Sequence, residues 1–429
     1  MDIKDLEGIE EKALEPLKKT ILFYSDCRFF AGCENMIANF LNSQILNDEF
    51  SVAFAYRYTE LYTQGLNSRV LDSKYKRFPL RLMKQTNYQR PMNYSFLGFI
   101  AHKFFFAIYI FFNKYISIFV NTAILFRFFK QNKIDILHIN NGGYPAAHSC
   151  YSAVIAARMV GINKIIYVVN NIAQDYQHPF RWLDYPIDFF IKKWVTFFIT
   201  GSEHAGKRLK KVLKLSEKKQ LTINNGIKKR AITLSIEEFK KKYSIPENNL
   251  IISVVANLEK RKGHIFLLEA VKQIVEQYPP ASIPYFIFEG MGPEKDNLKN
   301  FILKNRLTDY VLMVDFIPHI FNLLNASDIV VLPSVANEDF PNVIIEAMSL
   351  GKPVIATEIA GIPEQIENNN TGIIVKPRNA FELKLAIMKL VSNPSLIQQF
   401  SINAKKRFDT YYEESISVRK YLDLYKSII

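Results

Sequence analysis

The sequence lacks the features that mark secreted and membrane-spanning proteins. It has only three cysteines in 429 residues, Cys27, Cys33 and Cys150. These cysteines show no metal-ligand spacing and cannot all pair, so we interpret them as reduced thiols in a cytoplasmic protein. The first twenty residues carry six acidic side chains and four lysines, which is incompatible with the apolar core of a secretion signal. We therefore expect a cytoplasmic protein.

Acidic side chains are absent from residues 73–134, which contain eleven Lys or Arg residues and the most aromatic stretch of the chain, Phe96 to Phe129. The longest run there without a charged or amide side chain, Phe104 to Phe112, is far shorter than the about 20 residues that a membrane span needs. Polar residues recur at roughly helical spacing, which indicates interfacial or core-buried helices. Residues 1–225 carry +12 of the net charge of +14. We predict that residues 73–134 dock on an anionic membrane, at the inner face of the cell membrane. The alternative is that the helices of this segment only cover the first sheet.

Length and patterning predict two α/β domains. The 429 residues exceed the about 250–300 at which a single core usually divides. Short apolar runs with the length of buried strands alternate with helical patterns, which is typical of doubly wound sheets. The first run, Ile21 to Tyr24, leads into a loop that contains Gly32 and then into a helical pattern. Such an opening favours a Rossmann-like domain.

The stretch from Asn337 to Glu364 contains a short predicted helix with two carboxylates beside it. Pro341 suits a first helical position and Gly351 suits the residue just past a helix end. The apolar residues between them predict a buried helix of about ten residues. Glu346 then lies inside this apolar helix, where burial without a partner is costly, and we expect a hydroxyl-rich partner for it.

The start of this helix is a candidate site for a nucleotide-sugar. Free N–H groups and a partial positive charge at a helix start suit a diphosphate. On this interpretation the turn at Phe340 to Asn342 faces the diphosphate, Glu338 reaches the sugar hydroxyls and Glu346 accepts from ribose hydroxyls. The simpler alternative is a capped surface helix with a stray glutamate.

The same stretch resembles the signature of retaining family 4 glycosyltransferases, whose usual form is E-G-F-P-N-V-x-x-E-A-M-A-x-G-x-P-V-I-A-T. The resemblance implies the GT-B fold, an α/β architecture in which two Rossmann-like domains face each other across a cleft and a C-terminal helix crosses back to the first domain. Asn224 to Ile227 resembles the interdomain N-G-I-D turn of the family. We therefore expect an acceptor-binding domain at 1–225, a nucleotide-sugar-binding domain at 226–410 and the returning helix at 411–429.

The family resemblance also implies a set of site residues. Lys262 matches a family lysine that neutralises the donor diphosphate, and Arg261 is the candidate for the second cation, because Asn257 stands where many members have arginine. Gly290 lies in a turn that borders the nucleotide in the family, and the segment near Ile317 meets the base. The expected catalytic residues are Arg261, Lys262 and Glu338. The expected donor-binding residues are Gly32, Asn170, Asn257, Gly290, Ile317, Phe340, Pro341, Asn342, Val343 and Glu346.

Four positions depart from the family pattern. Asp339 replaces a flexible glycine. Either its negative charge weakens the binding of a diphosphate, or its side chain points away from the diphosphate. Asn170 stands where members often have a histidine near the sugar, so a proton-related role there is in doubt. Ala31 replaces the first glycine of the loop that includes Gly32, and Lys228 replaces the usual interdomain aspartate.

The predicted function is retaining transfer of a hexose-type sugar from a nucleotide-sugar, such as a UDP-sugar, to a lipid-linked glycan acceptor. Family analogy places this reaction in the assembly of capsule, lipopolysaccharide or exopolysaccharide. The sequence contains no Asp-x-Asp motif, so we expect neither a metal nor another cofactor, with leaving-group charge met by Arg261, Lys262 and helix N–H groups. In the family the departing diphosphate oxygen is thought to take the acceptor proton.

Three alternatives to sugar transfer require different features of the sequence. A catalytically silent subunit that binds a nucleotide or a partner transferase is favoured by the departures at Asp339, Asn170, Ala31 and Asn257. A nucleic-acid binder is suggested by the net charge of +14, but the aromatic residues lie in apolar helical segments rather than on an exposed strand platform. An epimerase would need a richer set of acids and histidines at the cleft. We therefore expect no nucleic-acid partner.

Overall fold

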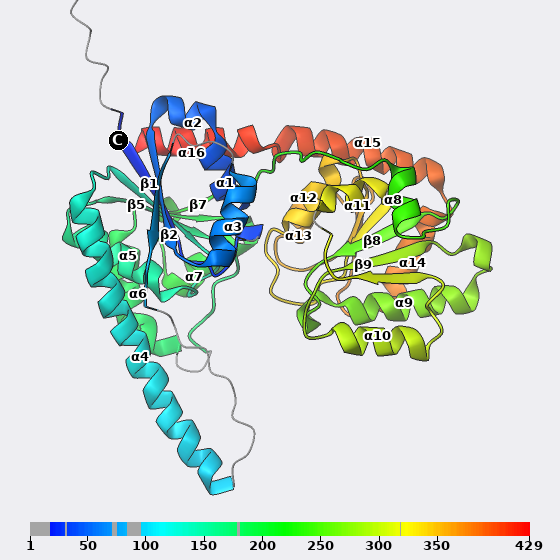
Figure 1. Cartoon of the computed structure of the whole chain (residues 1–429), viewed down its shortest axis with the longest axis horizontal. Coiled ribbons are helices and arrows are strands. Elements are labelled where there is room, and N and C mark those ends of the chain that lie inside the picture. The colour runs from blue at the N-terminus through cyan, green and yellow to red at the C-terminus, as the bar shows by residue number, and fades with distance from the viewer. Residues whose placement is uncertain (1–17, 31, 71–74, 84–95, 178–180, 318) are drawn as a thin grey trace, which may run out of the picture.

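The computed structural model describes residues 18–30, 32–70, 75–83, 96–177, 181–317 and 319–429, with the side chains of residues 96–111 left undescribed. Ala31, Lys74 and Lys84, on which parts of the sequence interpretation rest, lie outside the described residues. Two parallel sheets, of seven and six strands, form the two halves of the molecule (Figure 1). This confirms the predicted fold class.

The inner strands of the first sheet are buried on both faces, whereas the edge strand β3 has no buried residue. Its spatial order is β3-β2-β1-β4-β5-β6-β7, and every pairing is parallel. Alternate residues of β1 point to opposite faces, so Leu22 joins one core while Ile21 and Phe23 join the other. The strand bounds are β1 Thr20–Ser25, β2 Ser51–Arg57, β3 Lys76–Leu80, β4 Ile136–Asn141, β5 Lys164–Val169, β6 Phe197–Thr200 and β7 Gln220–Thr222.

Helices cover both faces of this sheet, which explains why its strands are apolar runs rather than alternating patterns. One face packs against α4, α5, α6 and α7, and the other against α1, α2, α3 and α16. The bounds are α1 Asn35–Asn42, α2 Gln44–Glu49, α3 Glu60–Arg69, α4 Phe96–Gln131, α5 His148–Met159, α6 Tyr185–Trp194, α7 Glu203–Leu213 and α16 Glu414–Ser427.

Helix α4 differs from the sequence prediction, which expected several helices in this segment. It is a single helix of 36 residues. Ile118 and Leu125 of its second half are buried against the sheet and α5. Its first half projects away from the rest of the molecule (Figure 1). Within the described residues, no helix combines the length and the apolar character required to cross a membrane.

The second sheet has the spatial order β10-β9-β8-β11-β12-β13 and is also parallel throughout. Its strands are β8 Ile251–Val255, β9 Tyr285–Glu289, β10 Val311–Val314, β11 Ile329–Leu332, β12 Val354–Thr357 and β13 Gly372–Val375. Its helices are α8 Ile236–Lys242, α9 His264–Gln277, α10 Lys295–Lys304, α11 Ile320–Ala326, α12 Asn342–Ser349, α13 Ile362–Gln365, α14 Ala380–Val391 and α15 Pro394–Tyr411.

The chain crosses between the halves twice, and the two crossings lie side by side. The first follows β7, and the second joins α15 to α16. The N–H of Ile227 donates to the carbonyl of Tyr412 at 3.0 Å, and Ile227 forms a parallel bridge with Glu413. Helix α16 then lies on the first sheet, where Tyr425 is fully buried. The crossing-back helix is thus present, whereas the exact domain limits at 225 and 410 remain a prediction.

His138 belongs to this core and not to the site described below. Its Nδ1 lies 2.7 Å from the Tyr425 hydroxyl, and complete burial lowers its pKa to about 3. The ring is therefore neutral at physiological pH and serves the packing of α16.

Candidate functional site

A cleft of about 510 Å³ lies between the two halves and is lined by residues from both. Eleven of the thirteen residues expected to form the site line it. They are Gly32, Asn170, Asn257, Arg261, Lys262, Glu338, Phe340, Pro341, Asn342, Val343 and Glu346. The fold therefore brings together residues that are more than 300 positions apart in the sequence.

The start of α12 forms one wall of this cleft. Pro341 is the N-cap and α12 begins at Asn342, one residue later than predicted. No side chain caps the helix within the described structure, so its first N–H groups are available to a ligand. The side chain of Asn342 spans the cleft, because its Nδ2 donates to the carbonyl of Gly32 at 2.8 Å. Gly351 follows the helix end with a φ of +66°, in the left-handed conformation predicted for it.

Two cations from the turn after β8 lie against Glu338. Lys262 donates to both carboxylate oxygens of Glu338, at 2.6 Å to Oε2 and closer to Oε1. Arg261 is 3.7 Å from the same carboxylate and also pairs with Glu259 at 2.6 Å. Gly263 makes this turn possible, since a Cβ there would lie 2.0 Å from the carbonyl oxygen of Pro333. The described structure thus holds both predicted diphosphate cations at the cleft, paired with acids.

Glu346 is buried within α12, as predicted, but its partner in the described residues is an arginine rather than a hydroxyl. Burial raises the pKa of Glu346, and the nearby Arg230 and Arg69 oppose this rise. Arg230 lies 3.7 Å from the carboxylate. Both arginines also donate to Asn35 Oδ1, Arg69 at 2.7 Å and Arg230 at 3.3 Å.

Arg69, Arg230 and Asn35 line the cleft but were missed by the sequence interpretation. Arg230 is the last residue of a run of three cations just after the interdomain turn, and this run was the available signal. Arg69 ends α3, in the part of the chain that resembles the family least, and nothing in its sequence neighbourhood distinguishes it.

Asn170 lies at the end of β5, where its side chain is already engaged. Its Nδ2 donates to Asn140 Oδ1 at 2.7 Å and to the carbonyl of Asn141 at 3.0 Å. The amide oxygen of Asn170 therefore remains as its acceptor at the cleft. This is a hydrogen-bonding group without the acid–base capacity of a histidine.

Gly290 and Ile317, which were expected to contact the donor, are not among the residues that line the cleft. Gly290 has a φ of +148°, and a Cβ there would lie 2.0 Å from the carbonyl oxygen of Ala256, so the strand end requires glycine. Ile317 is 4% exposed, and its N–H donates to Glu289 at 3.3 Å. The described geometry gives both residues a structural explanation, and their contact with the donor stays a prediction.

Asp339, which replaces the family glycine, bonds across the two halves. Its Oδ1 accepts a hydrogen bond from the Ser202 hydroxyl at the start of α7, and its Oδ2 has no partner among the described residues. Burial raises the pKa of Asp339 to about 6, against the lowering effect of the Ser202 hydrogen bond. Glu364 forms a second contact of this kind, because it accepts from the N–H groups of Glu203 and His204, each at 2.8 Å.

Comparison with known proteins agrees with this geometry. Residues 235–407 match the model of the family described as glycosyl transferases group 1. This range holds all six strands of the second sheet, the two cations and both cleft glutamates. The second half of the chain is therefore similar to the group 1 glycosyltransferases, and the whole chain has the GT-B fold.

Individual relatives cover the chain to different extents. An alpha-D-kanosaminyltransferase from Streptomyces kanamyceticus is 26% identical over 44% of this chain and 49% of its own length. The UDP-Gal:alpha-D-GlcNAc-diphosphoundecaprenol alpha-1,3-galactosyltransferase from Escherichia coli is 26% identical over 71% of this chain and 78% of its own. The chain thus spans about half the length of the first relative and more of the second. The Anabaena protein HepE, solved in complex with UDP-glucose, is 18% identical, covers 95% of this chain and 99% of its own, and has a TM-score of 0.73.

Proposed function

We propose that the chain is a retaining glycosyltransferase that moves a hexose-type sugar from a UDP-sugar to a lipid-linked glycan acceptor. The observation that carries this proposal is the convergence of Lys262, Arg261 and the uncapped start of α12 on one cleft. Together they supply two cations and the N–H groups of Asn342 and Val343 at a single place, which is what a diphosphate needs.

The Lys262–Glu338 ion pair would be broken when the donor binds. Lys262 is largely buried, with 12% of its side chain exposed, so it is held in place before a ligand arrives. A diphosphate that reaches Lys262 competes with Glu338 for the ammonium group. The carboxylate of Glu338 is then free to accept from sugar hydroxyls. Positioned charge of this type stabilises the charge that develops on the leaving group.

The proton balance of the reaction needs no protein base. The glycosidic bond to the donor phosphate breaks, a bond to the acceptor hydroxyl oxygen forms, and the hydroxyl proton passes to the departing diphosphate oxygen. The two cleft glutamates are engaged by cations, Glu338 by Lys262 and Glu346 by Arg230. The reaction as written assigns a proton to neither carboxylate.

The acceptor class rests on the Escherichia coli relative, whose name specifies a diphosphoundecaprenol-linked acceptor. By analogy we propose an acceptor of the same class for this chain, in the synthesis of a cell-surface polysaccharide. Such an acceptor lies in a membrane, so the enzyme must meet the membrane surface from the cytoplasmic side.

The surface proposed for this meeting is formed by α4, α6 and the turn Arg181–Asp184 that precedes α6. Its exposed apolar residues are Phe112, Ile116, Phe119, Trp182, Tyr185, Phe189 and Phe190. The Tyr115 hydroxyl donates to the carbonyl of Leu183 at 2.8 Å, so the two groups of residues adjoin. Exposed Arg127, Lys130 and Lys133 lie on and just beyond the same long helix. Apolar rings with basic residues nearby favour an anionic lipid surface.

Donor turnover tests the enzymatic proposal. Purified protein is incubated with a panel of nucleotide-sugars, and nucleotide release is measured without acceptor and with a lipid-linked glycan. We expect slow hydrolysis of a UDP-sugar that is accelerated by the acceptor. Binding of nucleotides with no turnover for any donor and acceptor would instead support the silent subunit.

Vesicle sedimentation tests the membrane surface. We expect binding to anionic vesicles that weakens in high salt, and weaker binding when Phe119, Phe189 and Phe190 are changed to serine. A matched control changes Phe381 and Ile402 to serine, because these residues are equally exposed on the second half. Changing Arg127, Lys130 and Lys133 to glutamine should remove the salt dependence. Binding that ignores lipid charge, or that the control lowers as strongly, would contradict the proposal.

A further inference from the structure

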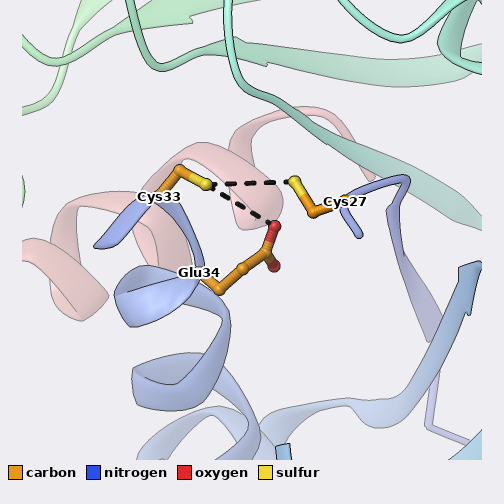
Figure 2. A group of neighbouring side chains, drawn as sticks. All are labelled: Cys27, Cys33 and Glu34. Atoms are coloured by element: carbon orange, nitrogen blue, oxygen red, sulfur yellow. Dashed lines mark hydrogen bonds between the residues drawn. The ribbon is translucent and has the colours of Figure 1, made fainter. Parts of the chain in front are cut away.

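Two of the three cysteines lie together in the fold although their spacing in the sequence did not indicate this. Cys27 follows β1, and Cys33 lies six residues further on, in the turn before α1. Their sulfur atoms are 3.9 Å apart, and Cys33 Sγ is also 3.9 Å from Glu34 Oε1 (Figure 2). The three ligand-type atoms all lie within 4.8 Å of one another. Both cysteines are free and partly exposed.

These separations are those of ligands around one small ion. Zinc binds thiolate sulfur at about 2.3 Å and carboxylate oxygen at about 2.1 Å in tetrahedral geometry. Two thiolates on one zinc ion are then about 3.8 Å apart, and a thiolate and a carboxylate oxygen about 3.6 Å apart. A disulfide would require the two sulfur atoms to be about 2.05 Å apart. The observed sulfur–sulfur distance of 3.9 Å fits the first arrangement.

The carboxylate of Glu34 is held in one position by its neighbours. Its side chain is fully buried, and it forms no ion pair within the described residues. Three neutral groups hold it in place: Ser25 Oγ at 2.7 Å from Oε1, Asn140 Nδ2 at 3.3 Å from Oε1 and the Tyr62 hydroxyl at 2.9 Å from Oε2. Such hydrogen bonds orient a metal-bound carboxylate. A buried carboxylate without a cation is costly, and a divalent ion would remove that cost.

We propose that Cys27, Cys33 and Glu34 form a binding site for a thiolate-preferring divalent cation of the zinc type. Both thiols lose their protons on binding. Two protons are therefore released to solvent as two metal–sulfur bonds form. Cys33 also lines the donor cleft, so water from the cleft is available as a fourth ligand. This site is independent of the proposed transfer reaction.

The ion would clamp the loop between β1 and α1. This loop carries Gly32, whose carbonyl accepts from Asn342 at the start of α12. The metal would therefore fix one edge of the cleft through the backbone, without contact with the donor. Its role in this position is structural.

Cobalt absorption spectroscopy tests the site directly, because Co²⁺ bound to thiolates in a tetrahedral site has characteristic visible and charge-transfer bands. Reduced, chelator-treated protein without a histidine tag is titrated with Co²⁺. We expect the bands to saturate at one equivalent and to disappear when Zn²⁺ is added. Cys27→Ser and Cys33→Ser should lose the charge-transfer bands, whereas Cys150→Ser should keep them, because Cys150 is buried and is not among the three residues whose ligand-type atoms lie together.

Thermal unfolding supplies a second measurement that separates binding from misfolding. Zn²⁺ should raise the melting temperature of the parent and of Cys150→Ser, and leave those of Cys27→Ser and Cys33→Ser unchanged. Variants that unfold cooperatively without metal show that the fold itself is intact. The proposal fails if reduced parent protein gives no cobalt bands, if the bands survive in Cys27→Ser, or if unreduced denatured protein has a single titratable thiol, which would indicate a disulfide.

Discussion

The two walls of the cleft are built in different ways. The wall from the second half comes mostly from two stretches, residues 255–262 and 337–346, with Arg230 and Ile320 beside them. The wall from the first half is assembled from separate places: the loop after β1, the end of α3 and the end of β5. The second wall holds two cations and two glutamates within the residues that match the family model, whereas the first wall lies outside those residues.

We infer from this difference that the two walls serve different ligands, the donor and the acceptor. A continuous motif keeps its geometry whenever its strand, turn and helix form, which suits a donor diphosphate common to many enzymes. A wall assembled from several loops can change one loop at a time, which suits the choice of acceptor. The following predictions test whether donor affinity resides in the second wall and acceptor choice in the first.

The largest effect is expected at Lys262, the most buried cation of the second wall. Lys262→Ala should lower turnover at least tenfold, since a preorganised group that stabilises leaving-group charge is removed. Steady-state kinetics with saturating donor measures it. Lys260→Ala is the matched control, because Lys260 lies in the same turn but does not line the cleft. Normal turnover in Lys262→Ala would rule out its phosphate role.

The next effect separates the two glutamates of the second wall. Glu346→Ala should weaken binding of both UDP and the UDP-sugar, because Glu346 lies inside α12 where the nucleoside is expected. Glu338→Ala should weaken the UDP-sugar and largely preserve UDP, because Glu338 lies in the loop before the helix. Isothermal titration with both ligands distinguishes them. Equal losses for UDP and the UDP-sugar in both variants would contradict the assignment.

A smaller effect is expected at Arg69, which belongs to the first wall. Arg69→Ala should raise the KM for the acceptor a few-fold and change UDP affinity less than twofold. Arg230→Ala should reduce UDP affinity more, since Arg230 lies 3.7 Å from Glu346 and follows the interdomain turn. If Arg69→Ala weakens UDP as much as Arg230→Ala does, the division between the walls is wrong.

The smallest effect on turnover is expected at Asp339, where the two walls meet. The change expected there is in how the stability of the protein depends on pH. Its folded pKa of about 6 lies above the ordinary value of 3.8, so the folded state holds the proton more tightly than the unfolded state. Its contribution to stability is therefore full below about pH 4 and is lost as pH rises to about 6. One carboxyl with such a shift changes the free energy of unfolding by about 1–3 kcal/mol.

Asp339→Asn keeps an acceptor for Ser202 and removes the titration. Relative to the parent, the variant should gain free energy of unfolding between pH 4.5 and 7, as measured by urea denaturation at both values. Asp315→Asn is the control, because Asp315 is exposed and its hydrogen bond with Lys295 lowers its pKa, so its titration changes stability in the opposite sense. Parallel pH profiles for the parent and Asp339→Asn would show that the carboxyl of Asp339 is not held in its neutral form.

The sequence predicted those parts of the molecule that depend on local chemistry. Apolar runs located the buried strands, and Pro341 and Gly351 placed α12 to within one residue. Features that depend on pairing between distant segments were not predicted. Arg69 meets Asn35 only because β1 and β2 lie side by side, and Cys27 meets Cys33 only because the loop between them folds back.

Helix α4 illustrates a second limit. The polar residues along this segment suggested several helices, but the segment contains neither proline nor an N-terminal cap that would divide it. Continuous helical propensity and packing of its second half on α5 are sufficient to form one helix. The periodicity of polar residues in this segment correctly predicted helical structure, but it could not predict the length of the helix.

The return of α16 to the first sheet has a consequence for the order in which the protein folds during synthesis. Val418, Tyr421 and Tyr425 complete the core around Phe23 and Phe40, so that core stays open until residues 414–427 have left the ribosome. All of the second sheet is made before then. The second half can therefore close first, while the first half waits with apolar surface exposed to chaperones or aggregation. The half that is synthesised first is the one that finishes folding last.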